Sequence, residues 1–540
     1  MTRNTPPASR AERPHRLILC NDGGTLQGLT REAPIGAQGL ADATVGPLVG
    51  TQVDTLYWQL GTDPGLATPS HRLSDVYSHD TRIGARFGAD GAGFDSAGSW
   101  RMYENTSTLL AEGTDPAGVV IEHGHRAGLE VFLSLRVNDI HDGSLPGPEH
   151  PLFSARKREH PEWLLGPVSK PAEVRIAGIS RFAYDFGVAA VRDYKLALAS
   201  EAIENYELDG LDLDFCRFPR LFAEGSEAQG AELLTDFLGR IRAALDRRSE
   251  RVGKRLLLSV RVPPTFALAR PFGIDVERWL ELGLLDILIA GVVHTSMHRV
   301  PVEEYVAACR GTGVQVIAQN LGMFWYGRPH SARVLYHEPG VYPDAMCRAA
   351  AANYWRAGVD GLYLWNNHVI EYWWDDRYGR GPWQEIADPA LIAGRDKHYV
   401  VDNPHEWLEW ARELGAPPVP EGPLPAALHA AGDAVDFDID IADDVAGAAA
   451  RGALAQVTLR LLVVNLTARD ALDYHLNDTP LDTGSATSRI LYNDFWYEFA
   501  LSPEALRQGW NRLRIAVRHR NSQVAAPLTV ESVEFLLAYR

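Results

Sequence analysis

Short apolar runs alternate with amphipathic segments over the first two thirds of the chain. Eight runs rich in leucine and β-branched residues predict strands, and segments with apolar positions at helical spacing precede several of them. This alternation predicts a parallel sheet closed into a (β/α)8 barrel. The predicted strands span 16–21, 53–60, 129–137, 208–215, 255–261, 285–293, 314–320 and 359–365. The clearest predicted helices span 187–206, 228–248, 301–312 and 343–357.

The pattern changes after a Pro-rich spacer at 416–425. Beyond it, strands with alternating polar and apolar residues follow one another with almost no helix, which is typical of a β-sandwich. The predicted strands there span 434–441, 455–465, 489–499, 511–518 and 529–539. We therefore expect an α/β fold, a (β/α)8 TIM barrel followed by a C-terminal all-β sandwich. The expected divisions are a disordered tail at 1–15, the barrel at 16–415, the linker at 416–425 and the sandwich at 426–540. Residues 507–515 resemble a hairpin common in jelly-roll domains attached to sugar-processing enzymes.

The fourth predicted barrel strand carries two carboxylates on one face. Because side chains alternate along a strand, Asp212 and Asp214 share a face with Gly210, and the leucines between them point the other way. Burying two adjacent carboxylates is unfavourable unless they are paired, and a perturbed proton affinity is the usual functional use of such an arrangement. We expect both to face the barrel lumen at its C-terminal end, within reach of an arginine.

Polar side chains also end the other barrel strands. In such barrels the C-terminal strand ends and the loops that leave them form the active site. The candidates for substrate binding are Trp58, Arg136, Asn138, Asp139, His141, Arg217, Arg261, His294, Gln319, Asn320, Trp325, Trp365 and Asn366. Arg136 or Arg261 could instead form a structural ion pair with Asp212. The aromatic clusters at 324–326 and 372–374 could be core, although exposed rings in such loops commonly stack on sugars.

Charge and composition exclude several classes of partner. The 540 residues include 52 Lys and Arg against 70 Asp and Glu, and the net charge of -18 repels nucleic acid and anionic membranes. The first 16 residues lack the apolar run of a secretory signal, and no segment has the apolar length of a membrane span. We therefore expect a cytoplasmic protein without a nucleic-acid or membrane partner. Neither a phosphate loop nor a dinucleotide fingerprint is present, so we expect no cofactor.

The sequence does not indicate a metal site. The four cysteines are scattered without the C-x-x-C spacing of a zinc site or a disulfide framework. His123 and His125 have the spacing of a metal pair, but they end the helix before the third strand and so fall at the wrong end of the barrel.

The acidic strand resembles two groups of barrel enzymes. Asp209, Asp212 and Asp214 match the strand-four signature of family 18 chitinases, except that Cys216 stands where those enzymes carry their catalytic glutamate. That difference removes the proton donor of the chitinase mechanism, so its activity is not carried over. The segment from Asp209 to Pro219 is closer to bacterial glycosyl-hydrolase-like TIM barrels. This resemblance implies a glycoside hydrolase fold and leaves the sugar open.

The sequence is compatible with three functions. The first is a glycosidase that acts on a carbohydrate substrate, with Asp214 in contact with it and Asp212 tuning the pKa of Asp214. The candidates for the second catalytic carboxylate are Asp22, Asp139 and Glu371, because the seventh strand ends in amides. The second is a uronate-type lyase or isomerase that uses His141 or His294 as base and an arginine as carboxylate clamp. The third is a sugar-binding protein without catalysis. The oligomeric state is left open.

Overall fold

The computed structural model describes most of the chain. It describes residues 16–28, 36–60, 97–140, 153–167, 180–216, 218–292, 298–320, 344–365, 381–401, 423–491 and 494–540. The predicted N-terminal tail and residues 416–422 of the spacer lie outside these ranges.

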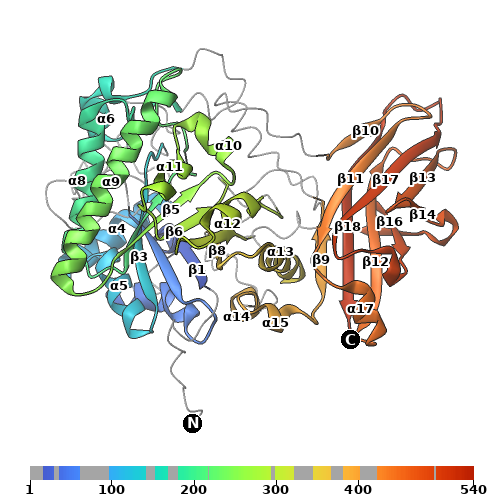
Figure 1. Cartoon of the computed structure of the whole chain (residues 1–540), viewed down its shortest axis with the longest axis horizontal. Helices are drawn as coiled ribbons and strands as arrows, with labels where there is room; N and C mark the ends of the chain where they lie inside the picture. The colour runs from blue at the N-terminus through green and yellow to red at the C-terminus, as the bar shows by residue number, and fades with distance from the viewer. Residues whose placement is uncertain are drawn as a thin grey trace, which may run out of the picture.

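The predicted barrel is confirmed. Eight parallel strands close on themselves in chain order, with β1 paired to both β2 and β8 (Figure 1). Each predicted strand is present, with ends that shift by up to three residues. The strands are β1 (Arg16–Asn21), β2 (Thr55–Leu60), β3 (Glu130–Arg136), β4 (Gly210–Asp214), β5 (Leu257–Val262), β6 (Ile287–Ala290), β7 (Gln315–Gln319) and β8 (Gly361–Trp365).

Helices occupy the connections between these strands. The four helices predicted most clearly correspond to α8, α9, α12 and α13. The helices of this region are α1 (Thr25–Gly28), α2 (Ala37–Thr44), α4 (Ala97–Ala111), α5 (Pro116–Arg126), α6 (Ala155–Glu159), α8 (Ala189–Asn205), α9 (Glu227–Val252), α10 (Phe266–Ala269), α11 (Val276–Glu281), α12 (Glu303–Cys309), α13 (Asp344–Ala357), α14 (Gly381–Glu385) and α15 (Pro389–Ile392). None of the helices in the described ranges combines the length and apolar character needed to span a lipid bilayer.

Side-chain alternation divides the barrel into an inner and an outer layer. On β4, Leu211, Leu213 and Phe215 pack outward among the aliphatic side chains that the helices cover. The lumen holds a separate cluster made of Ile18, Cys20, Tyr57, Phe132, Ile287, Ile289, Ile317, Tyr363 and Trp365. The first residue of β4 is Gly210. A larger residue would not fit there, because a Cβ would lie 2.2 Å from the Phe132 ring. The lumen face of β4 therefore begins with glycine and continues with two aspartates, Asp212 and Asp214.

An ion pair closes the N-terminal end of the lumen. Arg16 is buried and donates to Thr55 Oγ1 at 2.6 Å and to Glu130 Oε2 at 2.5 Å. Its Nε also donates to Gln315 Oε1 at 3.2 Å. These contacts join four strands at the end opposite to the one where the active sites of such barrels lie.

The C-terminal region is all-β apart from short helical segments such as α17 (Val445–Ala450), as predicted (Figure 1). One sheet has the order β10-β18-β12-β16-β15, with β9 also paired to β18, and the other has the order β11-β17-β13-β14. The predicted strand at 489–499 is two strands, β15 and β16, which pair as a hairpin. The strands are β9 (Lys397–Val400), β10 (Ala426–Leu428), β11 (Ala434–Ile441), β12 (Leu454–Val464), β13 (Ala471–Leu476), β14 (Thr479–Pro480), β15 (Thr487–Leu491), β16 (Asp494–Ala500), β17 (Gly509–His519) and β18 (Leu528–Tyr539).

The barrel and the sandwich share structural elements. Strand β9 precedes the spacer, yet it pairs with β18 from Lys397 opposite Leu537 to Val400 opposite Glu534. Helix α13 lies between the barrel strands and β9 (Figure 1), and its Ala349 belongs to the sandwich core. The C-terminal sheet therefore begins before the Pro-rich segment that was expected to precede it.

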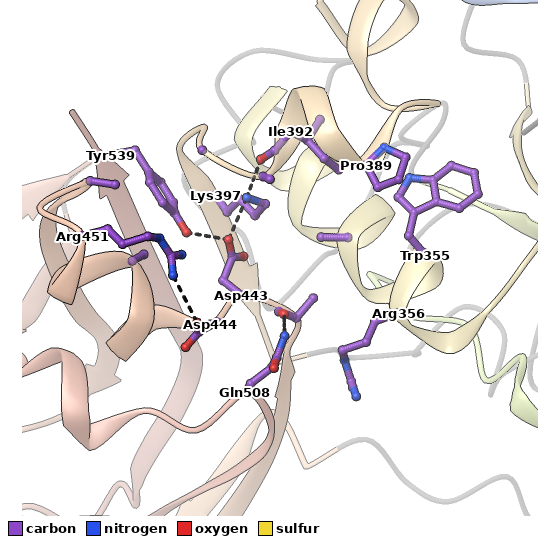
Figure 2. Close-up of a pocket in the computed structure, with 16 residues that line it drawn as sticks. Trp355, Arg356, Pro389, Ile392, Lys397, Asp443, Asp444, Arg451, Gln508 and Tyr539 are labelled. Carbon is purple, nitrogen blue, oxygen red and sulfur yellow. Dashed lines mark hydrogen bonds and ion pairs between the residues drawn. The ribbon is translucent and has the colours of Figure 1, made fainter. Parts of the chain in front are cut away.

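A cleft of about 630 Å³ lies where α13 and α15 face the sandwich (Figure 2). On its wall, Asp443 accepts hydrogen bonds from Lys397 Nζ at 2.9 Å and from Tyr539 Oη at 2.6 Å. Burial lowers the pKa of Lys397, and the charge of Asp443 opposes that effect. Because these polar groups are hydrogen-bonded to one another, they connect β9 to the sandwich along the wall of the cleft.

Candidate active site at the mouth of the barrel

Asp214 and Arg261 form a buried ion pair in the lumen. They are register partners on β4 and β5, and Arg261 Nη1 lies 2.9 Å from Asp214 Oδ2. The other carboxylate oxygen of Asp214 accepts the Cys216 N–H at 3.0 Å. Burial alone would lower the pKa of Arg261, but the charge of Asp214 raises it above its usual range. Strand parity thus places Asp214 inside the barrel and beside an arginine, as expected.

Asp212 lies one level deeper on the same face. Its carboxylate is completely buried and accepts hydrogen bonds from Ser134 Oγ at 2.6 Å and Ser259 Oγ at 2.8 Å, one from each neighbouring strand. Burial, followed by the nearby charge of Asp214, raises the pKa of Asp212 to about 7, while the two hydroxyls oppose this shift. The site therefore holds one carboxyl group that can carry a proton near neutral pH, next to a second that is matched to a cation.

Gln319 connects Arg261 to the next strands. Its Oε1 accepts from Arg261 Nε at 3.1 Å and Nη2 at 2.9 Å, and from the Val292 N–H at 3.1 Å. Gly291 leaves room for this arrangement, because a Cβ there would lie 2.6 Å from Gln319 Oε1 and 2.9 Å from Arg261 Nε. The Arg261 guanidinium also lies over the Trp365 ring, 5.4 Å from its centroid. Arg261, Gln319 and Trp365 are brought together, as the strand ends predicted.

Arg136 organises the carboxylates of the rim. It is the register partner of Asp214 on β3, and its guanidinium reaches Asp139 at 3.0 Å and Asp22 at 3.3 Å. Burial would lower the pKa of Arg136, but the charges of Asp139 and then Asp22 raise it. Asp139 is buried, whereas the Asp22 side chain is 24% exposed. Asp22 is therefore the more accessible of these two candidates for the second carboxylate.

The second strand places a different residue in the lumen from the one expected. Trp58 shares its face with Leu56 and Leu60 and packs in the outer hydrophobic layer, so it does not line the site. Gln59, on the alternate face with Tyr57, is buried at the C-terminal end of β2. Within the described part of the chain, neither polar atom of the Gln59 amide has a hydrogen-bond partner. The sequence contained this signal, since the alternation of Leu56, Trp58 and Leu60 already places Gln59 inside.

Two amides predicted to bind substrate serve the fold instead. The Asn138 side chain donates to the carbonyls of Tyr184 and Arg220, both at 2.9 Å, and accepts the Tyr184 N–H at 2.9 Å. Asn320 turns toward α13, where its Nδ2 lies 3.4 Å from the Cys347 carbonyl. Asn138 thus joins three loops, and Asn320 joins β7 to a helix. The remaining candidates, His141, Arg217, His294, Trp325, Asn366 and Glu371, lie outside the described residues.

The motif residues that flank the acidic pair have structural contacts. Asp209, at the start of β4, accepts from His125 Nε2 at 2.8 Å, from the Val131 N–H at 2.6 Å and from Lys254. Cys216 is buried, its Sγ donates to the Gly291 carbonyl at 3.4 Å, and burial raises the pKa of its thiol. In the described ranges no group of three or more His, Cys, Asp or Glu side chains is placed to hold a metal ion.

No protein-family model matches the sequence, and no curated protein matches it. Among solved structures, the chain is similar to α-L-fucosidase isoenzyme 2 from Paenibacillus thiaminolyticus, at 13% identity over 70% of this chain and 48% of that one, with a TM-score of 0.38. It is also similar to the α-galactosidase AgaB of family GH36 from Geobacillus stearothermophilus, at 13% identity over 94% of this chain and 55% of that one, with a TM-score of 0.35.

The glycoside hydrolase domain of PgaB (BpsB) from Bordetella bronchiseptica is a third similar structure, at 10% identity over 66% of this chain and 96% of that one, with a TM-score of 0.36. The chain spans about half the length of the first two structures. Two of these structures are named as glycosidases, a fucosidase and a galactosidase, and the third as a glycoside hydrolase domain.

Proposed function

We propose that the protein is a glycoside hydrolase that works at the C-terminal mouth of its barrel. The observation that carries this proposal is the pair Asp212 and Asp214, which lie on one strand face in different environments. One carboxyl group has a pKa raised to about 7, and the other is paired with Arg261. Pairs of carboxyl groups in contrasting environments are the usual basis of acid and base roles in glycoside cleavage.

In this proposal Asp214 and Asp22 act on the glycosidic bond. Asp214 is the upper member of the acidic pair, and Asp22 is the more exposed carboxylate of the rim. Both adjoin Arg136, which is the register partner of the first and reaches the second at 3.3 Å. Asp212 lies below Asp214 and has no exposed surface, so its role is to hold a proton near neutral pH without contact with the sugar.

Unsatisfied amide groups supply a reason for a polar ligand to enter the lumen. Gln59 and the Nε2 of Gln319 are buried, and within the described residues they have no hydrogen-bond partner. A buried amide without a partner is unfavourable, and sugar hydroxyls can both donate to it and accept from it. These groups therefore favour a polyhydroxylated substrate over an apolar one.

The lyase alternative requires a free cationic side chain, and among the described residues neither Arg136 nor Arg261 offers one. Arg261 is engaged by Asp214, Gln319 and the Val292 carbonyl, and Arg136 is engaged by Asp22 and Asp139. A uronate carboxylate would have to displace a carboxylate of the protein to reach either guanidinium. This arrangement favours a neutral sugar over an anionic one.

Incubation with a panel of aryl glycosides and oligosaccharides, followed by mass spectrometry, tests the proposal. Hydrolysis adds one water across the bond, lyase chemistry leaves an unsaturated product, and a binding protein leaves the glycans unchanged. We expect hydrolysis, and a fall of about a hundredfold or more in kcat for Asp22→Asn. Asp438→Asn, on an exposed strand of the sandwich, is the control and should keep its activity. Unsaturated products, or no product from any glycan, would overturn the proposal.

A further inference from the structure

Three aspartates alternate along one face of β11, and the third differs from the others. Asp436 and Asp438 lie opposite Arg514 and Arg512 of β17 and form exposed ion pairs with them. Asp440 lies opposite Trp510 instead, and its side chain is completely buried. Exposed pairs contribute little to stability, whereas a buried carboxylate requires strong partners.

The partners of Asp440 come from the barrel. Arg299 Nε donates to its Oδ2 at 3.1 Å, and Arg356 of α13 forms a second ion pair with its Oδ1. Asn353 of the same helix donates to the Asp440 carbonyl at 3.0 Å. The Arg299 guanidinium also lies over the Trp510 ring, 5.1 Å from its centroid. Asp440 and Trp510, which are register partners in the sandwich, thus both contact Arg299 of the barrel. Asp440 forms an ion pair with it, and Trp510 forms a cation–π contact.

Arg299 belongs to the connection that leaves the C-terminal end of β6. Its neighbour Val300 donates its N–H to Tyr354 Oη at 2.8 Å, and Tyr354 Oη donates to the Gln319 carbonyl at 3.1 Å. Gln319 in turn accepts from Arg261, which pairs with Asp214. A continuous series of contacts therefore runs from the acidic site to the sandwich.

The same connection is anchored at one further point. Tyr305, in the helix that follows, donates to the Pro263 carbonyl just beyond β5 at 2.6 Å. His298, immediately before Arg299, is buried, and burial followed by the nearby charge of His398 of β9 lowers the pKa of this imidazole to about 3, so it is neutral.

We propose that the sandwich is part of the catalytic apparatus: Asp440 and Trp510 are positioning residues that hold the segment His298–Val302 at the mouth of the barrel. Neither residue touches the acidic pair, and both act through Arg299. The role of this segment in catalysis rests on the proposed function. The contacts that fix its position are independent of that function. The sandwich is thereby more than a tethered sugar-binding module.

Hydrogen–deuterium exchange on the full chain tests the positioning directly. In Asp440→Asn the amides of residues 298–300 and 302 should exchange roughly tenfold faster or more, since Arg356 loses its carboxylate partner and Arg299 keeps only its exposed pair with Glu303. In Trp510→Leu, which removes a 59% exposed ring from the surface, the increase should be roughly two- to fivefold. Amides of β3 should not change in either variant.

Asp438→Asn is the matched control, because it removes a carboxylate from the same strand and face without a barrel contact. Unchanged exchange at 298–302 in both test variants, or an equal increase in the control, would overturn the proposal. If Asp440→Asn does not fold, Trp510→Leu alone decides. If glycosidase activity is found, kcat/KM should fall in the test variants in the same order as the exchange increases. If no glycan is cleaved, the exchange experiment still decides the positioning role.

Discussion

Asp214 and Arg261 stand at the same level of two adjacent strands, with their charges 2.9 Å apart and both side chains buried. This geometry gives Asp214 a structural role in addition to any chemical one. A buried arginine that loses the carboxylate paired with it destabilises a fold by several kcal/mol. The chemistry and the stability of the site are therefore coupled at this residue.

Replacement of Asp214 by asparagine should affect both properties. We expect the free energy of unfolding to fall by about 3 kcal/mol, because Arg261 is left without its counter-charge. We also expect kcat, measured per folded molecule, to fall about a hundredfold or more. Denaturant unfolding and turnover on one sample measure both effects.

The matched control is Asp209→Asn, at the other end of the same strand and bonded to His125 and Lys254. It should lose stability and keep its turnover per folded molecule. An Asp214→Asn protein that turns over normally once corrected for folded fraction would remove Asp214 from the catalytic residues.

Asp212 should make stability depend on pH. Its folded-state pKa of about 7 lies above the ordinary value of 3.8, so the folded chain binds this proton more tightly than the unfolded chain. The resulting stabilisation is complete below about pH 4 and is lost as pH rises through 7, with a slope of about 1 kcal/mol for each pH unit. Asp212→Asn should therefore be more stable than the parent at pH 8 and should gain nothing at pH 4. A difference in the free energy of unfolding between parent and variant that stays the same from pH 4 to pH 8 would contradict this.

Gln59 and Gln319 should respond to leucine in opposite ways. Gln59→Leu removes a buried amide that has no partner among the described residues and should leave the protein unchanged or more stable by about 1 kcal/mol. Gln319→Leu removes an acceptor shared by Arg261 and Val292 and should destabilise by about 2 kcal/mol. If Gln59 binds sugar hydroxyls, its substitution should nonetheless raise KM. A Gln59→Leu variant that is both less stable and unchanged in KM would show that the amide has only a packing role.

Truncation after residue 415 should yield an insoluble barrel. It leaves β9 without β18 and leaves Arg299 and Arg356 without Asp440. Exposed strand edges favour aggregation, and the loss of these ion pairs weakens the surface that the sandwich covers. Co-expression of residues 416–540 should restore soluble protein, which can be measured by the soluble fraction after lysis. A soluble, monomeric 1–415 fragment with native circular dichroism would show that the barrel is complete without the sandwich.

Local sequence patterns determine much of this architecture. The eight barrel strands and the inward orientation of Asp212 and Asp214 follow from alternation and from the number of apolar runs. The pattern at 489–499 predicts one strand instead of the hairpin of β15 and β16, because β-forming residues continue through both strands. The prediction that Trp58 binds substrate is wrong, because Trp58 shares its strand face with Leu56 and Leu60, and that face points to the outer layer.

Other features depend on contacts that are distant in sequence. Strand β9 is four residues long and follows two short helices, and only its pairing with β18, more than a hundred residues later, makes it a strand. Asp440 has the same local pattern as Asp436 and Asp438, so its burial can be recognised only from the barrel residues that approach it. The ion pair of Asp214 with Arg261, rather than of Asp212 with an arginine, likewise depends on the stagger between strands.

The position of β9 also restricts how this protein can be recombined. A chimera that exchanges the sandwich at the Pro-rich spacer would bring a foreign β18 against the resident β9, and the four register pairs between them would be mismatched. A functional crossover has to occur before residue 397, so that both strands travel together. In evolution, as in engineering, the unit that can be exchanged is therefore larger than the segment after the Pro-rich spacer. It also includes β9, which is contiguous in sequence with the barrel.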